Sequence, residues 1–123
     1  MSELRANTIS DAAGTGPATL TGQSAAKAWV NFNGTGTVAI RDGENISSLS
    51  DNGTGNYTIN FTTAMSDLNY APTASVKWGT GTGAVFYART TDALTTSSYQ
   101  CRTRIGTNST FADPDYVYAA FFR

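Results

Sequence analysis

The segment at residues 56–62 alternates strictly between large apolar and small polar side chains. Tyr57, Ile59 and Phe61 occupy every second position, and Asn or Thr fills the positions around them. Because successive side chains of a β-strand point to opposite faces of a sheet, this pattern predicts a strand with one buried and one solvated face. Antiparallel sheets commonly have one face in water, so the pattern favours antiparallel β structure.

Other strand-like segments follow one another at intervals of roughly 10 to 15 residues, separated by turns rich in Gly, Thr and Asn. No segment shows a sustained helical period. The predicted fold class is therefore all-β, an antiparallel β-sandwich of roughly seven to eight short strands. The last segment is apolar on both faces, which is typical of a strand inside a sandwich or at a subunit interface. The expected strands are residues 27–33, 37–42, 45–49, 56–62, 73–78, 84–90, 98–105 and 116–123.

Residues 1–26 differ from the rest of the chain, because they contain no aromatic residue and few large apolar ones. Two interpretations remain open for this segment: a partly ordered tail, or an extended arm that becomes ordered against another chain. We expect two parts, with residues 1–26 forming an N-terminal extended arm for anchoring or subunit contact. Residues 27–123 form the β-sandwich domain.

The composition excludes several classes of function. Only 14% of the residues are charged and the net charge is −1, whereas nucleic-acid binding needs a basic surface. No apolar run approaches the roughly 20 residues that cross a bilayer, and the N-terminus lacks the apolar core of a signal peptide. We therefore expect synthesis in the cytoplasm, no membrane insertion and no nucleic-acid partner.

The chain offers little for catalysis. It has no histidine, which is the commonest general base and metal ligand, and Cys101 is its single cysteine, so an intrachain disulfide is impossible. Residues 79–83 lack the Lys-Ser/Thr pair of a phosphate-binding loop. Asp113-Pro114-Asp115 could help to bind a hard cation, but the segment lacks the spaced ligands of a calcium loop, and Asp beside turns commonly bonds local backbone. We expect no enzyme activity, no cofactor and no metal.

Aromatic side chains leave molecular recognition open. Exposed aromatic rings beside Asn, Gln and Arg suit carbohydrate binding, because sugar rings stack on aromatic faces. The simpler interpretation is that most of these rings pack in the core. The candidate glycan or surface contacts are Trp78, Tyr87, Arg102 and Arg104, and the candidate subunit contacts are Trp29, Phe121 and Phe122.

Three segments resemble small receptor-facing β-modules of tailed-bacteriophage fibre proteins. They are residues 2–17 (SELRANTISDAAGTGP), 26–42 (AKAWVNFNGTGTVAIRD) and 51–61 (DNGTGNYTINF), and the resemblance extends over about half of the chain. It implies a virion structural protein, often trimeric, with an N-terminal part joined to the particle and a β-domain facing outward. The family has no catalytic residues to carry over.

The resemblance leads to two hypotheses about location in the virion. The first is a homotrimeric tail-fibre or spike component that attaches to a host-surface glycan and contacts other virion proteins through residues 1–26. The alternative is a capsid decoration, cement or head-fibre protein that stabilises the particle without recognising the host. A glycan-degrading enzyme is a third and weaker hypothesis, since carboxylate pairs are available but most lie beside turns.

Overall fold

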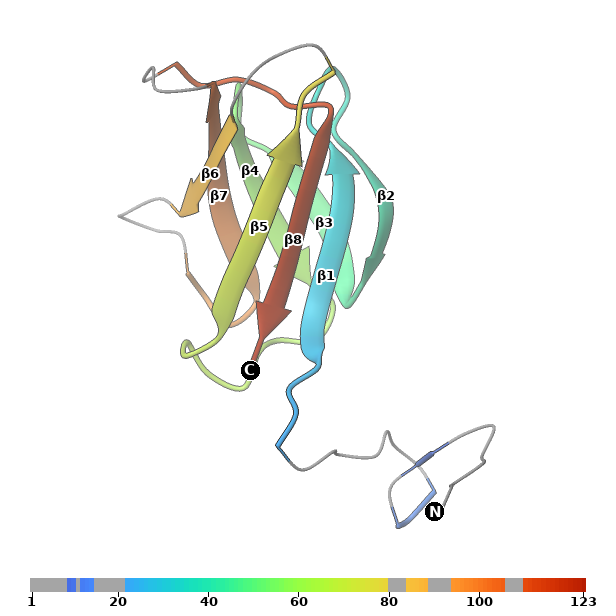
Figure 1. Ribbon diagram of the computed structural model, residues 1–123. Coiled ribbons are helices and arrows are strands. Elements are labelled where there is room, and N and C mark those ends of the chain that lie inside the picture. Colours follow the sequence, from blue (N-terminus) through green and yellow to red (C-terminus); the bar gives the residue numbers. More distant parts are fainter. Residues whose placement is uncertain (1–8, 11, 15–21, 80–83, 89–93, 106–109) are drawn as a thin grey trace, which may run out of the picture.

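The computed structural model describes residues 9–10, 12–14, 22–79, 84–88, 94–105 and 110–123. Within these ranges eight strands and no helix are found, and the strands form two antiparallel sheets that pack face to face (Figure 1). The predicted all-β sandwich is confirmed. The strands are β1 (Ala26–Asn33), β2 (Ala39–Glu44), β3 (Ile46–Asp51), β4 (Asn56–Phe61), β5 (Ala71–Lys77), β6 (Ala84–Ala88), β7 (Ser98–Ile105) and β8 (Tyr116–Phe122).

The first sheet has the strand order β2-β1-β8-β5 and the second the order β3-β4-β7-β6. β2 and β3 are consecutive in the chain but belong to different sheets, so the chain crosses between the layers at Asn45. The φ of Asn45 is +58°, in the left-handed region that Asn tolerates better than most residues. Its side chain amide donates to the carbonyls of Lys27 and Thr63, and its Oδ1 accepts from Thr63 N–H at 2.7 Å. These bonds hold the crossing in place.

The core lies between the sheets and is built from alternate residues of each central strand. The ring of Phe121 makes edge-to-face contacts with the rings of Phe61, Tyr70 and Tyr99, with centroids 5.0 to 6.0 Å apart. Such pairs add to the stabilisation that burial of each ring provides. The fully or nearly fully buried side chains include Ala28, Val30, Phe32, Tyr57, Ile59, Phe61, Tyr99, Cys101, Val117, Ala119 and Phe121.

The strand predicted to be apolar on both faces is the central strand β8, which lies between β1 and β5 (Figure 1). Val117, Ala119 and Phe121 face the core, and the residues that alternate with them face outward and are half-buried. The large outward side chains belong to Tyr116, Tyr118 and Phe122. The first sheet therefore has an aromatic outer face in addition to its apolar inner face.

Strand boundaries differ from the predicted ones mainly around β2 and β3, which each begin and end one or two residues later than expected. The loop before β2 is longer because Asn33 closes it with its side chain. Asn33 Nδ2 donates to the carbonyls of Thr35 and Thr37, and Asn33 Oδ1 accepts from Thr35 Oγ1 at 2.8 Å. An amide that bonds its own downstream backbone favours a turn over continued pairing.

Before β1, residues 22–25 are exposed and lead away from the sandwich (Figure 1). Residues 1–8, 11 and 15–21 lie outside the described residues. An anchoring or subunit-contact role for the arm therefore stays a prediction.

Candidate functional site

The predicted glycan contacts fall in different parts of the sandwich. Trp78 directly follows β5 and is half-buried, and its Nε1 is shielded from solvent without a hydrogen-bond partner among the described residues. The side chain of Tyr87, in β6, lies outside the described residues. Arg102 and Arg104 are on the outer face of β7, in the other sheet from β5.

Arg102 and Arg104 meet around one aromatic ring. Their guanidinium carbons lie 4.8 and 4.7 Å from the centroid of Phe111, within the range of cation–π attraction. The rest of this outer face is a network of amides and hydroxyls. Gln100 Nε2 donates to Asn56 Oδ1 at 2.9 Å, for example, across the pair of strands β4 and β7. Asn52 bonds Thr58 and Asn60 bonds Ser48 in the same way, so several polar groups of this face satisfy one another, although Arg102 Nε is shielded without a hydrogen-bond partner among the described residues.

The predicted subunit contacts divide between the two faces of the first sheet. Trp29 and Phe122 are half-buried on the outer face, where another molecule can reach them. Phe121 is 0% exposed and lies inside the sandwich, packed against Phe61 and Tyr99. Its ring cannot contact a second subunit while the two sheets stay packed, and the expectation for Phe121 is corrected accordingly.

Four half-buried aromatic side chains share the outer face of the first sheet: Trp29 on β1, and Tyr116, Tyr118 and Phe122 on β8. We call this surface the aromatic face. The rings of Tyr116 and Tyr118 stack at 6.0 Å with an angle of 16°. The guanidinium of Arg41 lies 4.0 Å from the centroid of the Tyr116 ring. In the sequence, the two-faced apolar pattern of the last strand and the candidate subunit contacts Trp29 and Phe122 pointed to this surface, whereas Tyr116 and Tyr118 were not among the candidate contacts.

A shallow groove of about 430 Å³ crosses the aromatic face at Ala120. Cross-strand pairing explains its position, since Trp29 and Thr73 both pair with Ala120, while Asn31 and Ser75 both pair with Tyr118. Directly opposite residues share one face of a sheet. The groove is therefore lined on its outer side by Trp29, Asn31, Thr73, Ser75, Tyr118 and Ala120.

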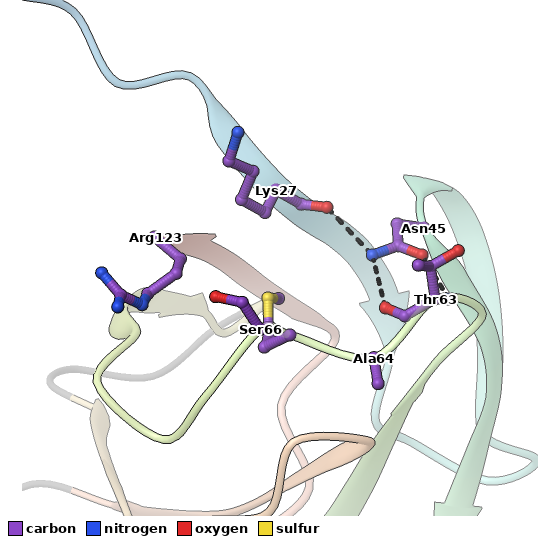
Figure 2. Close-up of a pocket in the computed structure, with 7 residues that line it drawn as sticks. Lys27, Asn45, Thr63, Ala64, Ser66 and Arg123 are labelled. Carbon is purple, nitrogen blue, oxygen red and sulfur yellow. Dashed lines mark hydrogen bonds between the residues drawn. The ribbon is translucent and has the colours of Figure 1, made fainter.

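A second hollow, of about 570 Å³, lies at the end of the sandwich where β1 begins. Figure 2 shows Asn45 at its rim, bonded to the backbone carbonyls of Lys27 and Thr63. The guanidinium of Arg123 pairs with Asp67, and its Nε donates to Asp67 Oδ1 at 2.7 Å. This hydrogen bond holds the pKa of the Asp67 carboxyl below its ordinary value. The side chains of Asn45 and Arg123 in this hollow therefore already have protein partners.

The carboxylates of Asp113 and Asp115, in the loop before β8, form hydrogen bonds that stabilise the fold. Asp113 Oδ1 accepts from Gly55 N–H at 2.6 Å and from the Tyr57 hydroxyl at 2.8 Å, and Asp115 accepts from Gly79 N–H. Burial, followed by the bond to Asp113, raises the pKa of Tyr57. Over the described ranges no three His, Cys, Asp or Glu side chains gather in a way that could hold a metal ion.

Cys101 is the one thiol of the chain, and it is buried in β7. Burial raises the pKa of the Cys101 thiol to about 12. The thiolate is the reactive form of cysteine, so this side chain is unsuited to act as a nucleophile.

Comparison of the chain with models of protein families, with curated proteins and with solved structures found no match. Among the residues described, no helix is long and apolar enough to span a membrane. The function is therefore argued from the surfaces of the sandwich itself.

Proposed function

We propose that this protein is a bacteriophage virion structural protein, a fibre or spike component that displays its β-sandwich for attachment to a host-surface glycan. The aromatic face is the observation that carries the proposal. Aromatic rings gathered on the outside of a small domain, beside polar side chains, are typical of a recognition surface. On this face Trp29 and Tyr118 flank a groove whose other outer residues are neutral.

The sequence resemblance supports the same function, because residues 2–17, 26–42 and 51–61 resemble receptor-facing modules of phage fibres. In such an assembly the β-sandwich faces outward and residues 1–26 contact other virion proteins. A homotrimer is the expected oligomer. The mass in solution tests this point, since a stable monomer at micromolar concentration would count against the trimer.

Two experiments test the proposed function. Purified protein, fluorescently labelled, is expected to bind host cells and to compete with particles for adsorption. Immunogold labelling is expected to mark the end of a fibre or spike. Label on the head lattice, together with no cell binding, would instead support the alternative of a capsid decoration or head-fibre protein.

A matched pair of variants connects the cell binding to the aromatic face. The change Trp29→Leu removes an outward ring from the first sheet, whereas Thr58→Ile alters the outer face of the second sheet at a comparable half-buried position. Cell binding is expected to fall with Trp29→Leu and to persist with Thr58→Ile. Equal binding of the two variants would show that attachment uses another surface.

A further inference from the structure

We propose that the groove over Ala120 is a binding site for one pyranose ring of a neutral glycan, with Trp29 as the stacking surface. This inference rests on the proposed glycan attachment, and it assigns the site and the class of sugar. It moves the contact away from Trp78, Tyr87, Arg102 and Arg104, where the sequence had placed it. The argument comes from the shape of the groove, its polar groups and its surrounding charge.

The shape follows from one small residue among large neighbours. Ala120 lies in the centre of the sheet, between Tyr118 and Phe122 along β8 and between Trp29 and Thr73 across the strands. A methyl group cannot fill the space between these larger side chains, so a groove of about 430 Å³ remains. This volume falls within the range of roughly 300–1,000 Å³ that is usual for small-ligand sites. An apolar floor with an aromatic wall suits the C–H-bearing face of a sugar ring.

The polar groups of the groove match sugar hydroxyls. Thr73 and Ser75 are exposed on β5 and offer hydroxyls on one side of the groove, and Asn31 offers an amide on the other. Asn31 Oδ1 is shielded and accepts no hydrogen bond from any described residue. A partner that excluded water without offering hydrogen bonds would leave the exposed hydroxyls of Thr73 and Ser75 unsatisfied, at a cost in binding free energy. A hydroxyl-rich ligand meets the requirement, and an apolar side chain of another protein does not.

The charge around the groove favours a neutral sugar over an acidic one. In the pairing of β1 with β2, Asp42 lies opposite Asn31 and Glu44 lies opposite Trp29, so both carboxylates share the outer face with the groove. Like charges in such proximity repel an acidic sugar. Cations lie farther along the strands than these two carboxylates, which are directly opposite groove residues. Arg41 and Lys77 approach the Tyr116 ring at 4.0 and 5.1 Å, and Lys27 lies two residues before Trp29, near the start of β1.

The test begins with an array that carries neutral hexose and N-acetylhexosamine oligosaccharides beside sialylated and uronate-containing ones. The neutral glycan that binds best is then titrated against each variant by calorimetry, and the indole N–H signals in NMR spectra of the unaltered protein show which tryptophan it contacts. The variant Ala120→Ile fills the groove with a side chain that suits a strand. The control Thr58→Ile places the same side chain on the outer face of the second sheet.

Ala120→Ile and Trp29→Leu are each expected to weaken binding of the neutral glycan by about tenfold or more. Thr58→Ile is expected to bind like the unaltered protein, and the indole signal that shifts in the unaltered protein is expected to be that of Trp29. Urea unfolding of each variant confirms that the sandwich is intact. If Ala120→Ile were unstable, Ser75→Ala would test the rim of the groove instead, with weaker binding again expected.

Three results would overturn the inference. In the first, Ala120→Ile binds the glycan as well as the unaltered protein does and Arg102→Gln loses binding, which would show that the glycan binds on β7. Another is a preference for the acidic glycans of the array. A third is conversion of an oligomer to a monomer by Ala120→Ile, which would make the groove a subunit contact. The proposed function fails separately, if the unaltered protein binds neither host cells nor any glycan.

Discussion

The hydroxyl of Tyr57 donates a hydrogen bond of 2.8 Å to Oδ1 of Asp113, a residue 56 positions later in the chain. The same hydroxyl lies 3.1 Å from the carbonyl oxygen of Gly34, and the same carboxylate oxygen accepts from Gly55 N–H at 2.6 Å. One buried phenol and one carboxylate thus connect β4, the loop after β1 and the loop before β8.

Replacing Tyr57 with Phe removes the hydroxyl and leaves the ring in the core. We expect a loss of about 1–3 kcal/mol in the free energy of unfolding, because the buried Gly34 carbonyl loses a hydrogen-bonding neighbour and Asp113 loses a donor. Urea unfolding followed by fluorescence measures the change. The control is Tyr118→Phe on the outer face, expected to stay within about 0.5 kcal/mol of the unaltered protein. Equal effects of the two changes would contradict the role of the Tyr57 hydroxyl.

Two glycines with nearly the same backbone conformation provide a matched test of close packing. Gly55 has φ +61° and Gly36 has φ +60°. A Cβ on Gly55 would lie 2.5 Å from the carbonyl oxygen of Thr103 and 2.9 Å from the backbone nitrogen of Ala112, whereas a Cβ on Gly36 would meet nothing within 4 Å.

We therefore expect Gly36→Ala to cost only the left-handed penalty of about 1–2 kcal/mol. Gly55→Ala should cost at least about 1–3 kcal/mol more, because rigid backbone atoms must move apart. Thermal unfolding of both variants measures the difference. Similar melting temperatures would show that the Thr103 carbonyl of β7 and the backbone of Ala112 can both shift away from Gly55.

The free energy of unfolding is expected to decrease at alkaline pH. Burial raises the pKa of Cys101 from 9.0, and those of Tyr70 and Tyr99 from 10.0, to about 12 in each case. Above pH 9 the unfolded chain releases these protons while the folded protein keeps them. The unfolded state then binds fewer protons, so the free energy of unfolding decreases as pH rises from about 9 toward 12.

Urea midpoints at pH 8, 9.5 and 11 measure this decrease. The variant Cys101→Ala should show a smaller decrease between pH 8 and 9.5, because the thiol has the lowest unfolded pKa of the three groups. In the unaltered protein at pH 8, a thiol reagent should react only on unfolding. Rapid reaction of the folded protein would show that Cys101 is accessible.

The exposed ion pair of Asp67 and Arg123 is expected to change the pKa of Asp67 more than it changes the free energy of unfolding. The hydrogen bond from Arg123 lowers the pKa of Asp67, so the pair stabilises the fold above the unfolded pKa of the carboxyl and loses that effect as pH falls. Exposed pairs are screened by water and salt. NMR titration of the Asp67 carboxyl should show a lowered pKa that rises toward its ordinary value in Arg123→Gln. An unchanged pKa in that variant would exclude the pairing in solution.

Period-two alternation made several strands predictable. The alternation of Tyr57, Ile59 and Phe61 predicted both the strand and its buried face, since strand geometry alone sends every second side chain to the same side. The same alternation runs along β7, where Tyr99 and Cys101 are buried and Arg102 is half-buried on the outer face. These predictions succeeded because the information that they need lies within a few consecutive residues.

The candidate site was not predictable in the same way. Phe121 and Phe122 are adjacent and chemically identical, so no local pattern indicates that Phe121 enters the core while Phe122 faces outward. The β8 pairings with β1 and β5 decide it, because a shift of one residue would exchange the two faces.

By itself, then, the sequence determined the all-β class and the inner face of β4, because those follow from periodicity along the chain. Only the tertiary structure decided where the groove lies. Trp29, Thr73 and Ala120 come from three strands far apart in the sequence, and they meet because strand order and register bring them onto one face. The partner of Tyr57 was decided in the same way, since its bond to Asp113 joins parts of the chain that only the packed sheets bring together.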